Sequence, residues 1–68
     1  MKMTENQVIQ YFEDFILPQV KETYEQDGIT DGPARREAFN NMVDYLTKDG
    51  EVSEELANEI CLPNHLDN

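Results

Sequence analysis

The stretch from Val8 to Val20, VIQYFEDFILPQV, limits the possible folds of this chain more than any other, because its apolar side chains follow helical spacing. Steps of three and four residues place a set of side chains on one face of a helix. This face contains Val8, Phe12, Phe15, Ile16 and Gln19, and is widened by Ile9 and Val20. Runs of β-branched residues with strict alternation are few, so strands are not supported. The sequence therefore predicts that this stretch is the central helix.

Tyr11, Leu17 and Tyr24 fall outside that face, so the helix is apolar over more than half of its circumference. An ordinary surface helix buries an arc of about 100°. One interpretation is that the rest of the chain covers one side and that a second copy or a partner protein covers the other. A homodimer through Tyr11, Leu17 and Tyr24 would cover that second side. The alternative is that Tyr11 and Tyr24 lie along the surface with their hydroxyls in water.

Pro18 lies inside this pattern and changes what the pattern predicts. Its ring removes one helical hydrogen bond and clashes with the preceding turn, so we expect a kink or a break near Leu17. A break would shift the phase of Val20 and Tyr24 and could return both side chains to the core.

Helix starts are indicated by three triplets that read apolar, hydroxyl, acid. In each, the hydroxyl would cap free N–H groups and the acid would favour the positive end of the helix dipole. Thr4 also forms a capping box with Gln7. The triplets are Met3-Thr4-Glu5, Ile29-Thr30-Asp31 and Val52-Ser53-Glu54, and their apolar members would pack as hydrophobic staples on Val8, Ala34 and Ala57. Gly28 and Gly50 stand where helices end in a left-handed residue.

These signals predict one all-α domain over residues 1–68, with helices at 5–26, 33–48 and 54–61 and a loose tail at 63–68. Short connections favour antiparallel neighbours, which gives a compact three-helix unit: a helical hairpin plus a short third helix. The second helix would bury Ala38, Phe39, Met42, Val43, Tyr45 and Leu46, and the third Leu56, Ala57 and Ile60. Arg35 lies in the second helix's apolar face, either as a snorkelling stem or as a bridge to a carboxylate such as Glu13.

The net charge of −10, from 15 acidic and 5 basic residues, excludes some classes of partner. Phosphates and anionic membranes would be repelled, so we expect neither direct nucleic-acid binding nor membrane binding. Basic protein surfaces would be attracted. A single cysteine, no apolar segment of membrane-spanning length and a first stretch, MKMTENQ, without a signal peptide favour the cytoplasm.

No residue pattern in the sequence reaches the ligand set of a metal or cofactor site. Calcium loops built around Gly32 or Gly50 would have Ala38 or Leu56 at the position that requires a bidentate acid. Cys61 and His65 have a metal-like spacing, but two ligands do not make a zinc site. We therefore expect Cys61 to be a small buried residue and His65 a free tail residue. A chain this small offers little room for a catalytic pocket, so we expect neither cofactor nor enzyme activity.

The acidic side chains themselves remain as candidates for function. Two groups crowd the predicted junctions between helices, and only Lys48 stands near the second group in the sequence. These candidate partner-binding residues are Glu22, Glu25, Asp27, Asp31, Asp44, Asp49, Glu51, Glu54, Glu55 and Glu59. Like charges at helical spacing reduce stability, and carboxylates on helices can imitate the phosphate spacing of DNA. One interpretation is a DNA mimic that occupies a basic groove, and the other is a plainly solvated surface.

The segment 36–63, REAFNNMVDYLTKDGEVSEELANEICLP, resembles small acidic proteins of bacteriophages and mobile elements. The shared features are an aromatic helix, a Lys-Asp-Gly turn, a hydroxyl cap and a terminal proline. The resemblance implies a viral origin, a host cytoplasmic location and inhibition of a host protein.

Two hypotheses follow from the sequence as a whole. The protein is either an inhibitor or modulator of a nucleic-acid-binding protein, or a structural interaction module acting through the apolar excess of the first helix.

Overall fold

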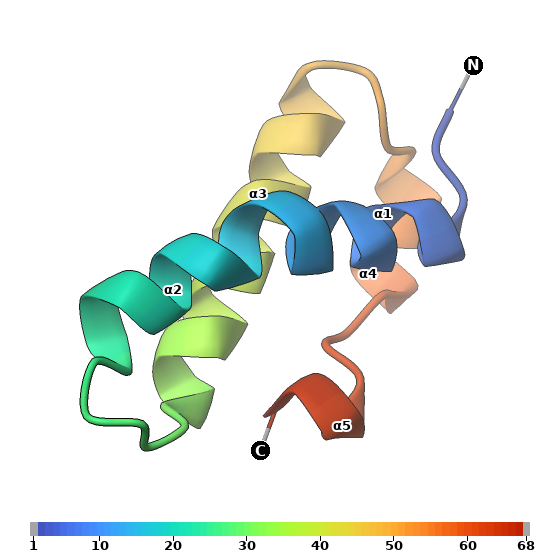
Figure 1. The fold of residues 1–68 in the computed structure, drawn as a ribbon. Helices are drawn as coiled ribbons and strands as arrows, with labels where there is room; N and C mark the ends of the chain where they lie inside the picture. Colours follow the sequence, from blue (N-terminus) through green and yellow to red (C-terminus); the bar gives the residue numbers. More distant parts are fainter. Residues whose placement is uncertain (1, 68) are drawn as a thin grey trace.

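A computed structural model describes residues 2–67 of the chain, and helices are the only regular secondary structure in that range. The elements are α1 (Glu5–Tyr11), the π-helix η1 (Phe12–Ile16), α2 (Leu17–Tyr24), α3 (Gly32–Lys48), α4 (Glu54–Glu59) and α5 (Asn64–Asp67). The first three run end to end as one rod that crosses α3, and α4 and α5 follow behind and below it (Figure 1). The predicted all-α fold is confirmed, and its three-helix outline holds roughly: the rod, α3 and α4 correspond to the predicted helices, but α5 is a further short helix and the rod crosses α3 instead of lying antiparallel beside it.

Pro18 does not break the rod, because the turn before it widens into a π-helix. The Leu17 N–H donates to the Phe12 carbonyl, which is the five-residue step of a π-helix. A widened turn accommodates the proline ring, which would clash with a carbonyl four residues earlier in a regular α-helix. The extra residue rotates everything after it by about 100° relative to α1.

This rotation corrects the predicted apolar face of the rod. The buried residues are Val8, Phe12, Leu17 and Val20, so the step from Phe12 to the next core residue is five rather than four. Leu17, predicted to lie outside the face, is in the core, whereas Phe15, predicted to be buried, is 59% exposed. Val20 returns to the core, as the phase-shift alternative expected, but Tyr24 stays exposed. Ile16 is half-buried.

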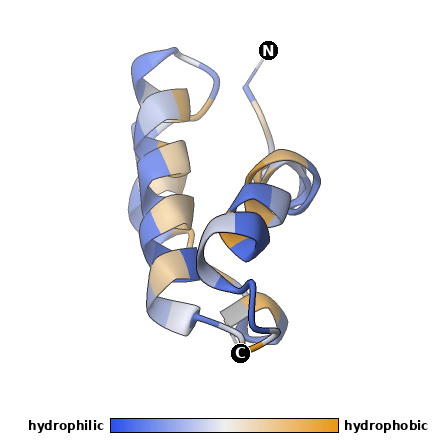
Figure 2. Ribbon diagram, turned by 60° about the vertical axis from the view of Figure 1, so that its left-hand side comes forward, coloured by the Kyte–Doolittle hydropathy of each residue, from blue (hydrophilic) through white to orange (hydrophobic). Residues whose placement is uncertain are grey.

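The core lies between the rod and one side of α3. Phe12 and Phe39 are both fully buried and meet edge to face with ring centroids 5.4 Å apart. The hydrophobic residues of α3 face the rod in Figure 2. Met42, Val43 and Leu46 are buried as predicted, but Tyr45 is 61% exposed because it lies beyond the edge of that face. Leu56, Ala57 and Ile60 are half-buried at the margin of the core.

Local capping explains most of the helix boundaries. Thr4 and Gln7 form the predicted capping box, and the Ser53 hydroxyl accepts from the Leu56 N–H. The chain leaves α3 through a Schellman motif, in which Gly50 has φ +83° and the Glu51 N–H donates to the Leu46 carbonyl. The first and third predicted helices each end two residues earlier than expected, at Tyr24 and Glu59.

The start of α3 differs from the prediction. The cap is Asp31, whose carboxylate accepts from the Ala34 N–H, and not Thr30. Ile29 is 68% exposed, so the predicted staple between it and Ala34 does not form. Gly28 has φ +82° but closes a turn after α2 instead of ending the helix directly.

The C-terminal segment is ordered by Arg35 and Leu66, which corrects the predicted loose tail over 63–67; residue 68 lies outside the described residues. Arg35 donates from Nε and Nη2 to the two carboxylate oxygens of Glu25, at 2.6 and 2.7 Å. Its Nη1 donates to the Leu66 carbonyl at 2.9 Å, and the Leu66 side chain is buried in the core. Arg35 therefore joins the end of α2, the start of α3 and α5. The predicted bridge is present, but its partner is Glu25 and not Glu13.

Glu25 makes stability depend on pH. The hydrogen bonds from Arg35, aided by the Asp31 N–H, lower the pKa of Glu25 from 4.5 to about 2. Between these values the unfolded chain binds a proton that the folded chain does not, so the pair stabilises the fold above about pH 4.5 and loses this effect as pH falls to about 2. We expect Glu25→Gln to be less stable than the parent at pH 7, with the difference closing over that window.

The stability of Glu25→Gln must be compared with that of the parent at each pH, because protonation of the other carboxylates also changes the stability of both proteins by relieving charge repulsion. Thermal unfolding followed by circular dichroism across the pH range measures it. Glu22→Gln, three residues earlier and exposed, is the matched control and should differ little from the parent at any pH. A stability difference for Glu25→Gln that stays constant from neutral to acid pH would contradict the role given to this carboxylate.

Candidate functional site

The two predicted acidic groups lie at opposite ends of α3 and do not form one surface. Asp31 of the first group caps the start of α3, and Asp44, the nearest member of the second group along α3, lies thirteen residues or about 20 Å of helix further on. The first group is beside the start of α3 and the second beside its end. A single small basic patch on a partner therefore cannot cover both.

The first group is largely used within the fold. The Glu25 carboxylate is held by Arg35, and its side chain is only 6% exposed. Asp31 caps α3 and is half-buried, and the Asp27 carboxylate accepts from the Ile29 N–H. Glu22 is exposed. These carboxylates organise the turn between α2 and α3, which leaves little of the group for a partner.

The second group is exposed and gathers around the end of α3, the following turn and α4. We call it the α3–α4 acidic surface. It consists of Asp44, Asp49, Glu51, Glu54, Glu55 and Glu59, all of them exposed. Lys48 lies 3.3 Å from Asp44, but both side chains are mostly in water, so this pair contributes under about 1 kcal/mol.

Lys2 is a second cation beside this surface that sequence reasoning missed. Its Nζ donates to the Gly50 carbonyl at 3.0 Å, and the Met3 N–H donates to the Glu51 carbonyl at 2.7 Å. The N-terminal segment is thus attached to a turn nearly fifty residues away in sequence. Among the described residues, six carboxylates stand beside two ammonium groups, so the surface keeps a local excess of negative charge.

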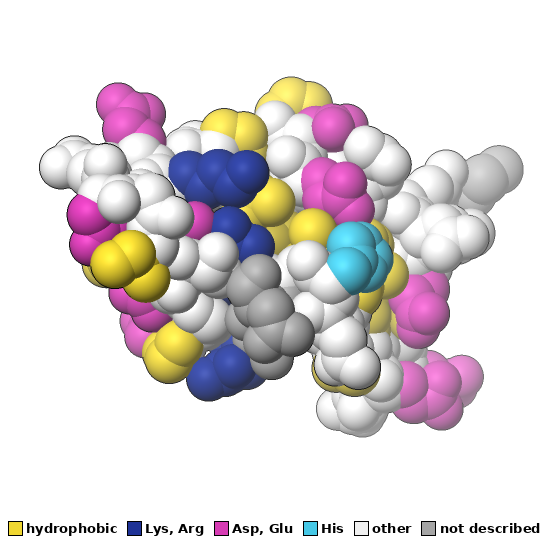
Figure 3. All heavy atoms as spheres, turned by 60° about the horizontal axis from the view of Figure 1, so that its bottom comes forward, with side chains coloured by type: hydrophobic (Ala, Val, Ile, Leu, Met, Phe, Trp, Pro, Cys, Tyr) yellow, Lys and Arg dark blue, Asp and Glu magenta, His cyan; other side chains and the backbone are white. Residues whose placement is uncertain are grey.

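The opposite pattern is visible on the face that carries α5. Lys and Arg side chains gather in the left half of that face, and Asp and Glu side chains lie around them and beside the His side chain (Figure 3). His65 is exposed there, with Nε2 3.9 Å from a carboxylate oxygen of Glu13. Cys61, predicted to be buried, is exposed, because α4 ends before it and the chain is extended at Ile60.

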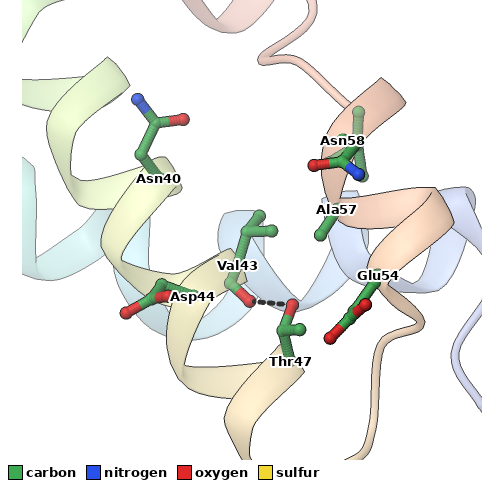
Figure 4. Close-up of a pocket in the computed structure, with 8 residues that line it drawn as sticks. Asn40, Val43, Asp44, Thr47, Glu54, Ala57 and Asn58 are labelled. Atoms are coloured by element: carbon green, nitrogen blue, oxygen red, sulfur yellow. Dashed lines mark hydrogen bonds between the residues drawn. The ribbon is translucent and has the colours of Figure 1, made fainter.

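A hollow of about 370 Å³ lies beside the α3–α4 acidic surface, between α3 and α4. Thr47 of α3 and Glu54 and Ala57 of α4 point toward the space between the helices, and Asp44 lies at the rim of the hollow on α3 with its side chain directed away from α4 (Figure 4). Val43 lies between the two helices, and the Thr47 hydroxyl donates to its carbonyl at 2.7 Å. This hollow combines apolar area with carboxylates, whereas the described residues contain no cluster of three or more acidic, His or Cys side chains arranged to hold a metal ion.

The predicted dimer residues do not share an exposed surface. Leu17 is buried, Tyr11 is half-buried and contacts Phe15 in a tilted ring pair with centroids 5.0 Å apart, and Tyr24 is 59% exposed. Leu17 is therefore not available for the predicted contact, because the π-helix turns it into the core and exposes Phe15 instead, and the homodimer itself stays a prediction.

We compared the chain with known protein families, curated proteins and solved structures. No protein-family model, no curated protein and no solved structure matches the chain. Within residues 2–67, none of the helices has the length and hydrophobicity needed to cross a bilayer.

Proposed function

We propose that this chain is a non-enzymatic binding protein that inhibits or modulates a host nucleic-acid-binding protein in the cytoplasm. The observation that carries the proposal is the α3–α4 acidic surface, where six exposed carboxylates stand beside two cations. A partner surface rich in Arg and Lys complements it. The resemblance of segment 36–63 to small acidic phage proteins supports a viral origin and a host target.

The acidic side chains differ in whether they have a role in folding. Carboxylates that cap helices or pair with Arg35 have a role in folding, but those of the α3–α4 acidic surface repel one another and make the compact state less stable. A basic protein that binds this surface would relieve the repulsion between its carboxylates, which favours binding. The electrostatic attraction would also accelerate the encounter of the two proteins. Proteins that hold DNA present such basic surfaces, because phosphates carry most of the affinity for the duplex. DNA mimicry is the form of inhibition that this charge pattern favours.

Removal of charge from the α3–α4 acidic surface should strongly reduce partner binding. We expect the parent chain, immobilised in a bacterial lysate at about 50 mM salt, to retain nucleic-acid-binding proteins and to release them at about 500 mM. The variant Asp44→Asn/Asp49→Asn/Glu54→Gln/Glu55→Gln should retain at least about tenfold less, because each lost contact weakens the salt-dependent attraction. Mass spectrometry of the retained proteins measures this, and displacement of labelled duplex from a retained protein tests mimicry.

The control variant neutralises four carboxylates elsewhere, Glu5→Gln/Asp14→Asn/Glu22→Gln/Asp27→Asn, and has the same net charge. It should retain partners as the parent does. Equal loss in both variants would show that net charge alone attracts the partners. Retention that does not change with salt or with either variant would refute the proposal.

A further inference from the structure

Three neighbouring hollows lie along α3, bordered on the other side by α4 and by the non-helical residues that flank it. The central one, of about 370 Å³, shares Asn40 with a hollow at one end and shares Thr47 and Glu54 with a hollow at the other. The end hollows measure about 320 and 430 Å³. Shared lining residues make them one furrow, which we call the α3–α4 furrow. It follows α3 from Arg36 to Thr47, a length of about 17 Å or three helical turns.

The furrow has an apolar floor and polar walls. Val43 is buried beneath it, and Ala57 and Ile60 are half-buried beside it. Glu54 points from α4 toward α3, and Asp44 lies at the outer rim on α3 with its side chain directed away from α4, so exposed carboxylates border the furrow on both sides (Figure 4). An occupant must therefore offer an apolar stripe flanked by positive charge.

The walls also decide the secondary structure of the occupant. At the central hollow the walls are α3 and α4, whose backbone groups are largely bonded within the helices, so they offer no row of free N–H and C=O groups to an added strand; the non-helical residues Cys61 and Leu62 border one end hollow only. Docking must use side chains. A helix that lies between two helices places residues at i, i+3, i+4 and i+7 into such a furrow.

We infer that the α3–α4 furrow binds a basic amphipathic helix of the partner protein, an inference that rests on the proposed function of the adjoining acidic surface. Apolar side chains of that helix cover Val43, Ala57 and Ile60. Lys or Arg side chains flanking the apolar stripe reach Asp44 at the outer rim on α3 and Glu54 on α4. The acidic surface attracts the partner, and the furrow selects the helix.

A designed peptide probes this inference directly. The probe is an end-capped Lys-Leu-Ala peptide of about 14 residues, with Leu at the i, i+3, i+4 and i+7 positions of one face and Lys on both flanks. A scrambled peptide of the same composition, with Leu spread around the helix, is its control. We expect the amphipathic peptide to bind the parent chain about tenfold more tightly than the scrambled one, measured by calorimetry. In ¹⁵N-labelled protein, the amide shifts should be largest around Val43 and Ala57.

Two matched pairs of variants distinguish the effect of filling the furrow from the effect of removing its negative charge. Asn58→Trp fills the central hollow and should reduce binding of the amphipathic peptide to the level of the scrambled one. Asn41→Trp, on α3 at a different hollow, should not. Asp44→Asn/Glu54→Gln should weaken both peptides, whereas Glu22→Gln/Asp27→Asn, with the same change in charge, should weaken neither by as much. Circular dichroism checks that each variant is folded.

The possible outcomes distinguish peptide binding in the furrow from peptide binding to the acidic surface alone. Equal binding of both peptides, weakened only by Asp44→Asn/Glu54→Gln, would overturn the furrow and leave the acidic surface supported. Amide shifts confined to the Tyr24 and Asp31 end of α3 would overturn the furrow as well. Binding of neither peptide at millimolar concentration would count against both proposals.

Discussion

Phe12→Ala should lower the free energy of unfolding by about 3–5 kcal/mol, which approaches the whole stability of a domain this small. Phe12 is fully buried, meets Phe39 edge to face and belongs to the π-helix that sets the phase of the rod. The truncation leaves a cavity between the rod and α3 that neither helix can close without moving the other. Urea unfolding followed by circular dichroism measures the loss, and we expect the variant to be largely unfolded at 37 °C.

Phe15→Ala is the matched control, since it removes the same side chain from the same π-helix. Phe15 is 59% exposed and contacts Tyr11 at the surface, so we expect a cost below about 1.5 kcal/mol. A regular α-helix through this stretch, as its spacing alone suggests, would bury Phe15. Equal destabilisation by the two substitutions would therefore contradict the π-helix.

Leu66→Ala should cost about 2–5 kcal/mol, although only two residues follow Leu66 in the sequence. Its side chain is buried and belongs to the same core cluster as Phe12 and Phe39. Loss of that packing also loosens α5 over Arg35, whose Nη1 bonds the Leu66 carbonyl. Thermal unfolding measures the cost.

The neighbouring His65 provides the control for this prediction. Its side chain is 71% exposed, and its 3.9 Å approach to Glu13 is a surface pair. His65→Ala should change stability by less than about 1 kcal/mol. If Leu66→Ala proved as mild as His65→Ala, the C-terminal segment would be the loose tail that its composition predicts.

The position of the candidate site follows from how the fold uses its charges. Carboxylates near the α2–α3 turn are drawn into capping and into the Arg35 pair, while those around the end of α3 have no comparable task. The α3–α4 furrow lies beside the latter because the short α4 leaves its apolar residues half-buried. The same shortness that makes α4 a marginal helix thus leaves space between it and α3.

Sequence reasoning missed the furrow for a physical reason. Val43 and Ala57 are ordinary core residues in the sequence, and their spacing carries no sign of a hollow between them. Such a hollow depends on how closely two helices approach, which is set by the packing of the whole core. The signal that was present in the sequence is the acidic run from Asp44 to Glu59, and this run borders the furrow.

The sequence by itself determined the features that depend on neighbours within a few residues. The Thr4 capping box, the Ser53 cap and the left-handed Gly50 all follow from local hydrogen bonds and backbone sterics. The buried face of α3 follows from helical periodicity, with Tyr45 as an exception at its edge. For these reasons the all-α class and the approximate bounds of the rod, α3 and α4 were predictable, whereas α5 and the π-helix were not.

Only the tertiary structure decided the features that join residues far apart. Arg35 meets Glu25 and Leu66 across separations of 10 and 31 residues, and Lys2 meets Gly50 across 48. The π-helix belongs with them, because Pro18 permits a kink, a break or a widened turn, and burial of Leu17 and Val20 against α3 selects the last. Local chemistry left several conformations open at these points, and the free energy of packing one core chose among them.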